Sequence, residues 1–108
     1  MRAARLAAGL AAIALLAGCG SGAAPKNHVH LTAFEQHGRT LFIRSCGSCH
    51  ALADAGTSGI VGPALNQPWA ASRIREVIAD GPGQMPAGLL SGNAAAAVAA
   101  YIAAATGG

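Results

Sequence analysis

The chain has 108 residues, of which 53% are hydrophobic and only 10% are charged, and its formal net charge at pH 7 is +3. This length allows one small domain. No basic cluster interleaved with aromatic residues is present, so the composition argues against a nucleic-acid-binding function.

Residues 1–18 have the features of a secretory signal. Arg2 and Arg5 precede an uncharged apolar run of about twelve residues, which is shorter than the roughly 20 needed to span a bilayer. An uncleaved transmembrane helix is therefore the weaker interpretation. Leu16-Ala17-Gly18-Cys19 resembles the bacterial lipobox, which implies cleavage before Cys19 and lipid on its thiol. An ordinary signal helix that contains Cys19 is the alternative.

Residues 19–31 have the composition of a flexible tether. The segment is rich in small and polar residues and is interrupted by Pro25. A tether of this length spans roughly 20 Å, enough for a small domain to swivel above a membrane. His28 and His30 alternate along it and are expected to be solvated rather than to bind metal. The folded domain is predicted over residues 32–108.

The first helix is predicted to begin after Thr32 and to run toward Cys46. Thr32 and Glu35 have the spacing of a capping box. Gly38 costs a helix about 1 kcal/mol relative to alanine, so its presence predicts that another backbone, that of the last helix, approaches closely there. The side chains that share one stripe of this helix are those of Phe34, Gly38, Leu41, Phe42 and Ser45.

Two further helices are predicted, over about Ser72–Ala79 and Asn93–Ala105. The last one has Ser91 as a plausible N-cap. No segment alternates convincingly as a strand, so the chain reads as all-α. The residues expected to face the core are Ile74, Val77 and Ile78 on the first of these helices, and Val98, Tyr101 and Ile102 on the second.

Cys46, Cys49 and His50 form a Cys-x-x-Cys-His motif, the attachment site of c-type haem. In such a site the two thiols add across the vinyl groups of the porphyrin and the histidine ligates the iron. A plain cysteine pair is the alternative, but thiol-disulfide exchange is disfavoured because no βαβ pattern surrounds the motif. A zinc site would need two further ligands, and the folded part has no third cysteine.

Met85 is the candidate for the sixth iron ligand. It is the only methionine after the signal segment, and glycines and prolines around it would make a stiff loop able to place the sulfur over the ring. With His50 and Met85 both bound, the iron has no open position for a substrate. The sequence therefore predicts a one-electron carrier rather than an enzyme.

From Thr32 to Thr106 the chain resembles a class I cytochrome c of the small bacterial kind. Gly38, Phe42 and Cys46 follow one another at intervals of four residues, as in the first helix of that family, and Val98 and Tyr101 resemble the matching pair on its last helix. The resemblance implies an all-α, cytochrome c-like fold of three to four helices wrapped around one covalently bound haem c. It also implies that the N-terminal and C-terminal helices cross near Gly38.

The same resemblance implies roles for two residues outside the motif. Gly62-Pro63-Ala64-Leu65 is similar to the loop whose proline carbonyl accepts a hydrogen bond from the ligating histidine, here Pro63 from His50. Trp69 is expected either to donate a hydrogen bond to a haem propionate or to cover the haem as an apolar lid.

These features predict an exported, lipid-anchored, one-electron carrier with a single haem, on the extracytoplasmic or periplasmic face of the cell membrane, in a respiratory chain. No residue identifies its redox partners, for which quinol-cytochrome c reductase and a terminal oxidase are candidates. Two alternatives stay open. One is a haem-based sensor or small-gas binder in which Met85 dissociates, and the other is a fixed electron-entry subunit of a larger respiratory complex.

Overall fold

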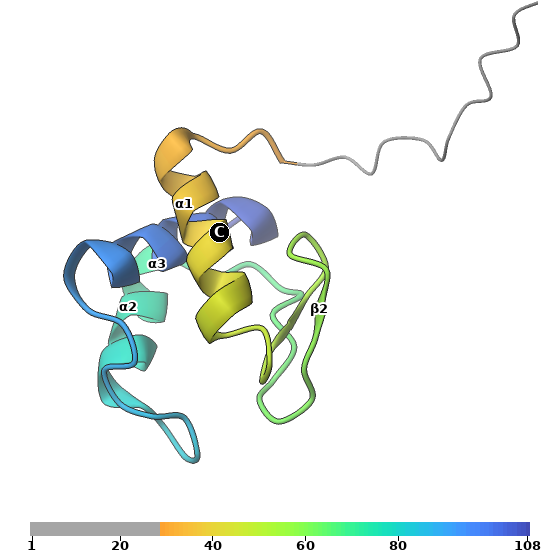
Figure 1. Cartoon of the computed structure of the whole chain (residues 1–108). Coiled ribbons are helices and arrows are strands. Elements are labelled where there is room, and N and C mark those ends of the chain that lie inside the picture. The colour runs from red at the N-terminus through yellow and green to blue at the C-terminus, as the bar shows by residue number, and fades with distance from the viewer. Residues whose placement is uncertain (1–28) are drawn as a thin grey trace, which may run out of the picture.

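Three helices and one short hairpin form the part of the chain that the structure, a computed structural model, describes, residues 29–108 (Figure 1). The predicted signal segment, Cys19 and His28 lie outside the described residues. No helix within residues 29–108 is long and apolar enough to cross a membrane. The elements in chain order are α1 (Ala33–Ser45), β1 (Ala51–Leu52), β2 (Thr57–Ser58), α2 (Ala71–Asp80) and α3 (Gly92–Thr106).

Helix α1 begins at the predicted capping box. The Thr32 hydroxyl accepts a hydrogen bond from the Glu35 amide at 3.2 Å, and the Glu35 carboxylate accepts one from the Thr32 amide at 2.7 Å. The prediction that Phe34 belongs to the packed stripe is wrong, because its side chain is 45% exposed. Phe34 belongs neither to the hydrophobic core nor to the partly buried residues that pack against it.

Helices α1 and α3 cross at Gly38, as predicted. A Cβ atom on Gly38 would overlap the backbone carbonyl of Ala97 and would lie 2.9 Å from the Cβ of Tyr101. Beside this crossing Phe42 and Tyr101 are fully buried, with ring centroids 6.0 Å apart. The absence of a side chain at position 38 therefore lets the two backbones approach and buries the largest residues of the core.

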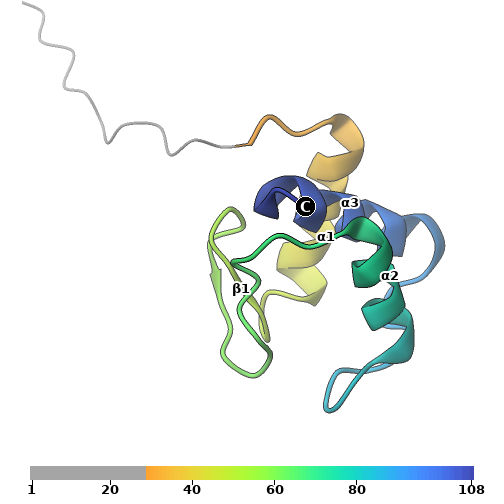
Figure 2. The same ribbon diagram turned by 180° about the vertical axis from the view of Figure 1, so that it is seen from behind.

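Helices α2 and α3 lie within one or two residues of their predicted bounds. Ser91 is the N-cap of α3, although its side chain makes no capping hydrogen bond. The buried residues include Ile74 and Ile78 on α2 and Val98 and Ile102 on α3, as the spacing predicts. Seen from behind, α2 and the chain that precedes it lie against α3 (Figure 2). These contacts complete a small core of helices.

The hairpin of β1 and β2 was not expected from the sequence. Its antiparallel strands have two residues each, with Ala51 opposite Ser58 and Leu52 opposite Thr57. Strands of this length are too short for an alternating pattern to show. The fold class stays all-α, because the hairpin is a local turn next to the Cys-x-x-Cys-His motif and not a layer of the core.

A polar contact ties the hairpin turn to both α1 and α3. The Tyr101 hydroxyl donates a hydrogen bond to a carboxylate oxygen of Asp54 at 2.6 Å, and the Arg39 Nε lies 3.5 Å from the same oxygen. The Arg39 guanidinium also donates to the backbone carbonyl of Asp54 at 3.0 Å. The sequence did not reveal this group, because its members are far apart in the chain and none belongs to a recognisable motif.

This contact should make stability fall at alkaline pH. Burial, and then the hydrogen bond to Asp54, raise the pKa of Tyr101 above its ordinary value of 10.0. The folded state then holds the phenol proton more tightly than the unfolded state, so the stabilisation is complete below pH 10 and is lost as the pH rises further. Tyr101→Phe should lower the free energy of unfolding by about 1–2 kcal/mol at neutral pH. The variant should also no longer lose stability as the pH rises above 10.

Denaturant unfolding at neutral and alkaline pH measures this effect. Tyr101 is the only tyrosine of the chain, so ultraviolet titration of the folded protein reports on it directly. Ionisation near pH 10 in the folded protein would contradict the prediction.

Candidate functional site

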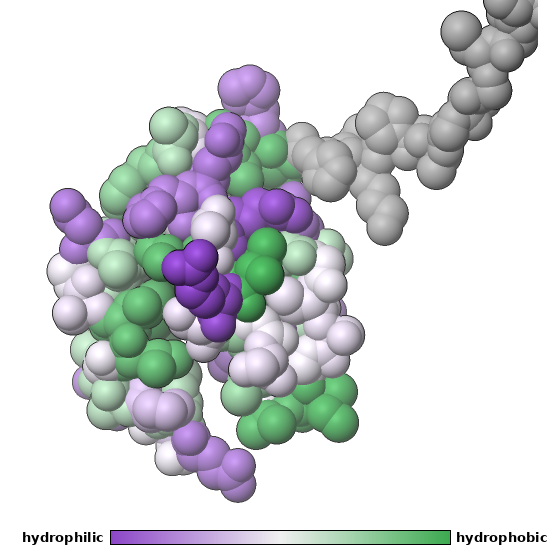
Figure 3. Space-filling model, in the orientation of Figure 1, coloured by the Kyte–Doolittle hydropathy of each residue, from purple (hydrophilic) through white to green (hydrophobic). Residues whose placement is uncertain are grey.

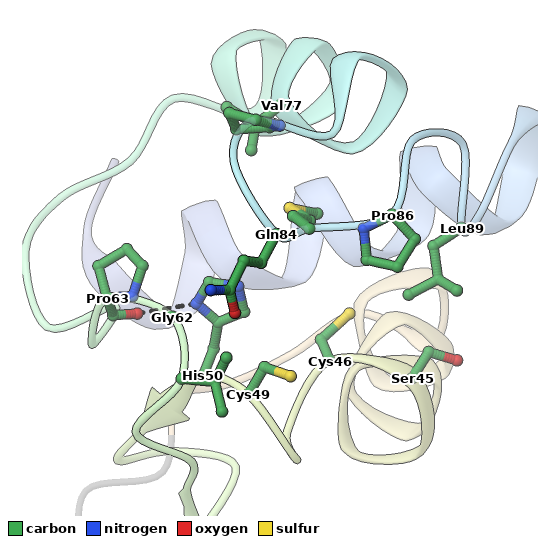
Figure 4. A pocket seen from close by; sticks show the side chains of 13 residues that line it. Ser45, Cys46, Cys49, His50, Gly62, Pro63, Val77, Gln84, Pro86 and Leu89 are labelled. Atoms are coloured by element: carbon green, nitrogen blue, oxygen red, sulfur yellow. Dashed lines mark hydrogen bonds between the residues drawn. The ribbon is translucent and has the colours of Figure 1, made fainter.

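One cavity of about 430 Å³ brings the predicted site residues together (Figure 4). Its walls come from the end of α1, the loop between β2 and α2, α2 itself, and the loop between α2 and α3. The predicted site residues that line it are Cys46, Cys49, His50, Pro63 and Met85.

Cys46 and Cys49 lie on a tight turn that follows directly from α1. The amides of Cys49 and His50 both donate to the Cys46 carbonyl, at 3.1 and 3.0 Å. Figure 4 shows both thiols directed into the cavity beside the His50 ring, and no disulfide joins them. Burial, with a smaller contribution from Cys49, raises the pKa of the Cys46 thiol to about 11.

The imidazole of His50 is held in one orientation. Its Nδ1 lies 2.8 Å from the carbonyl oxygen of Pro63, the hydrogen bond that the family resemblance implies. With Nδ1–H as the donor, Nε2 carries the lone pair that a metal requires. A Cβ on Gly62 would overlap the His50 ring, so glycine there allows the loop to close against it.

Met85 reaches the cavity from the loop between α2 and α3. Its amide donates to the Pro82 carbonyl at 3.1 Å, and the Gly88 amide donates to the Ile78 carbonyl at 2.8 Å. These bonds fasten both sides of the loop, and the side chain of Met85 is half-buried against the core. The thioether is therefore held at the cavity wall by a loop anchored to α2.

Trp69 does not line the cavity. It packs against the core, its amide donates to the Thr106 hydroxyl at 3.1 Å, and its indole Nε1 is buried without a hydrogen-bond partner among the described residues. A buried donor without a partner is uncommon and costs about 1–3 kcal/mol. Contact with a haem propionate stays a prediction for this residue.

Thr57 is a supporting residue that the sequence did not single out. Its hydroxyl donates to the His50 carbonyl at 2.9 Å and accepts from the Leu52 amide at 3.0 Å. It thereby fixes the backbone just after the motif and helps to set the direction of the His50 side chain. A threonine in a turn carries no signal for this role, which depends on the hairpin.

The donor set fits a haem and not a lone metal ion. Within the described residues no three His, Cys, Asp or Glu side chains gather around one point, which a structural zinc would require. The cavity instead offers two thiols on one turn, an imidazole nitrogen and a thioether, the groups that attach and ligate haem in cytochromes c.

Comparison with known proteins decides the family. The model for cytochrome c oxidase, cbb3-type, subunit III matches residues 33–102. This chain belongs to the cytochrome c family. It is 32% identical over 98 residues to cytochrome c-551 of Bacillus subtilis (strain 168), covering 87% of this chain and 88% of that protein. Its structure resembles that of the c-type cytochrome SorU from Sinorhizobium meliloti, with a TM-score of 0.62 and 38% identity, over 68% of this chain and 92% of that one.

As a c-type cytochrome the protein carries one covalently bound haem c and acts in electron transfer. When bound, the haem supplies an iron that gains and loses one electron. Cys46 and Cys49 would hold it covalently and His50 would bind its iron, with Pro63 maintaining the imidazole orientation and its basicity.

The covalent attachment can be tested directly. Acid-acetone extraction of the haem-loaded chain should leave the colour with the protein, because two thioether bonds survive denaturation. Replacing both Cys46 and Cys49 with serine should release all the haem into the solvent, whereas Ser48→Ala, between them, should release none. Loss of haem from the parent chain would show that Cys46 and Cys49 are not the attachment sites.

Proposed function

We propose that this cytochrome is a membrane-tethered one-electron carrier on the extracytoplasmic side, working in a respiratory chain. The observation that most supports the electron-carrier part of this proposal is that His50 and Met85 line the same cavity as the two cysteines. If His50 and Met85 both bound the iron, no ligand position would remain for a substrate, so the haem would supply one-electron transfer, and no enzymatic activity is proposed.

The respiratory setting rests on the comparisons. The matching family model is named for a subunit of a cbb3-type cytochrome c oxidase. A carrier of this kind would receive electrons from a donor such as quinol-cytochrome c reductase and deliver them to a terminal oxidase. Docking to either would bury a small area, because carriers must dissociate after each transfer.

Voltammetry and carbon monoxide binding test this proposal. The haem-loaded chain should give one reversible one-electron wave, and its reduced form should bind carbon monoxide slowly, because Met85 must first dissociate. Rapid binding of carbon monoxide would instead favour a haem-based sensor or gas binder. It would also disprove that Met85 occupies the sixth ligand position of the iron.

The name of the family model also favours a second candidate, a fixed electron-entry subunit of an oxidase. Purification in mild detergent separates the two possibilities. A mobile carrier should elute alone, whereas a fixed subunit should co-elute with the oxidase in a constant ratio.

The tether is proposed on Cys19, which ends the Leu-Ala-Gly-Cys sequence. Lipid on this residue would hold the domain at the membrane, with each buried CH₂ contributing about 0.8 kcal/mol. Cys19→Ser should release the domain from the membrane fraction or leave the signal segment uncut. Fractionation and gel migration measure this, and a variant indistinguishable from the parent would refute the lipid anchor.

A further inference from the structure

The loop that carries Met85 has little packing along its outer side. It joins α2 to α3, and its residues 82–84 and 86–89 are exposed. In the space-filling view this end of the molecule projects beside a hollow (Figure 3). Contacts with the rest of the domain therefore do not fix the course of the loop, and its own base has to determine where Met85 lies.

Gly81 lies at that base, where the chain leaves α2. It is the C-cap of α2, with φ at 56° in the left-handed region, and its amide donates to the Val77 carbonyl at 2.9 Å. The returning chain comes so close that a Cβ on Gly81 would overlap the Ala87 amide nitrogen and lie 2.6 Å from the Met85 carbonyl oxygen. Favourable contact between such atoms begins near roughly 3.5 Å. The closed loop therefore leaves no room for a side chain at position 81.

Gly83, on the same loop, has the same backbone conformation without the close approach. Its φ is 60°, yet a Cβ there would meet nothing within 4 Å. A left-handed conformation favours glycine at both positions, whereas only Gly81 is also required by lack of space. The two glycines thus separate backbone conformation from steric room.

The atoms that a side chain at position 81 would meet belong to the backbone of Met85 and Ala87. Backbone atoms cannot rotate out of the way as the end of a side chain can, so the loop itself would have to move. Pro82 fixes its own φ, and Pro86 restricts the backbone of the preceding Met85. A displacement at the base would therefore be passed on to Met85.

We propose that Gly81 is a positioning residue for the sixth iron ligand. Its missing side chain allows the loop to close, and closure holds the Met85 thioether at the wall of the haem cavity. This inference rests on the electron-carrier function proposed above, in which Met85 fills the sixth position, and it names what keeps Met85 there. A Cβ at position 81 would be in overlap only while the loop is closed, so it would favour a loop from which Met85 has left the iron.

Imidazole binding to the oxidised, haem-loaded chain tests the proposal. Imidazole can take the sixth position only after the thioether has left, so its apparent affinity reports the fraction of open loop. Gly81→Ala should raise that affinity at least about tenfold, because opening relieves the overlap. Gly83→Ala is the matched control. It imposes the same positive-φ strain without overlap and should raise the affinity less than about threefold.

Gly81→Asn keeps the test decisive if Gly81→Ala yields too little folded protein. Asparagine adopts the left-handed conformation more readily than alanine does and is found at helix C-termini, but it carries the same Cβ. It should therefore fold better and still raise the imidazole affinity at least about tenfold. If only the alanine variant raised the affinity, backbone strain would be the cause and the proposal would be wrong.

The effect should also disappear once Met85 has been removed. In a Met85→Ala protein, adding Gly81→Ala should change the imidazole affinity by less than about twofold, because no thioether remains to be positioned. A further tenfold rise would show that Gly81 acts on the cavity and not through Met85, which would overturn the proposal.

These measurements distinguish the inference from the function on which it rests. If Met85→Ala binds imidazole no more tightly than the parent, Met85 is not the sixth ligand and both proposals lose their basis. If Met85→Ala binds it more tightly while Gly81→Ala and Gly83→Ala behave alike, the ligand assignment stands and Gly81 does not position Met85.

Discussion

Replacing Met85 with alanine should abolish the weak charge-transfer band of oxidised His/Met haem in the red. It should also open the iron to carbon monoxide and lower the reduction potential. A thioether favours the ferrous state, and Met85 is the only methionine after the signal segment, so no other thioether can take its place. Axial ligands set haem potentials over roughly 0.8 V, and a fall of about 0.1–0.3 V is expected. Visible spectra and voltammetry of the haem-loaded variant measure these changes.

Gln84→Ala is the matched control, because Gln84 lies next to Met85 on the same loop and lines the same cavity. It should keep the band and the slow reaction with carbon monoxide. His37 is not expected to replace the lost ligand, because it lies about two turns before Cys46 on α1. A Met85→Ala protein that keeps both band and potential would show that another group is the sixth ligand.

Gly38→Ala should destabilise the protein by about 1–3 kcal/mol, even though alanine is the better helix former. Helix propensity alone predicts a gain of about 1 kcal/mol in the interior of α1. The added Cβ would overlap the Ala97 carbonyl, a backbone atom that can move only if α3 shifts. A loss of stability would therefore show that the close crossing of α1 and α3 dominates, and a gain would show that helix propensity dominates.

Denaturant unfolding, followed by helical circular dichroism and by the haem absorbance, measures this change. His37→Ala, one residue earlier and exposed on the same helix, should stay within about 0.5 kcal/mol of the parent. A Gly38→Ala protein more stable than the parent would mean that α1 and α3 do not pack as closely as the structure shows.

Much of the secondary structure could be predicted from local chemistry. The capping box at Thr32 and Glu35 set the start of α1, and the spacing of Ile74 and Ile78 indicated the buried side of α2. Phe34 was misplaced because periodicity tells which face of a helix is apolar, not how far along the helix its neighbour extends. The two-residue strands of the hairpin were too short to give any period.

The candidate site was predictable where its chemistry is contained in a short motif. Cys46, Cys49 and His50 lie within five consecutive residues, so their spacing alone indicates haem attachment. Thr57 was missed because its hydrogen bonds to the backbone around the motif exist only once the hairpin has formed.

Local sequence was enough to predict the helices, the kind of cofactor and the attachment motif, because each depends on residues within one or two turns of one another. Which distant groups come together became clear from the folded chain. It placed the Pro63 carbonyl on His50, brought Met85 to the cavity that contains Cys46, and joined Asp54 to Tyr101. The physical reason is that these contacts require chain closure over many residues, and burial of the core stabilises that closure. At Gly38 the close approach of α1 and α3 that the sequence predicts is also the one that the structure shows.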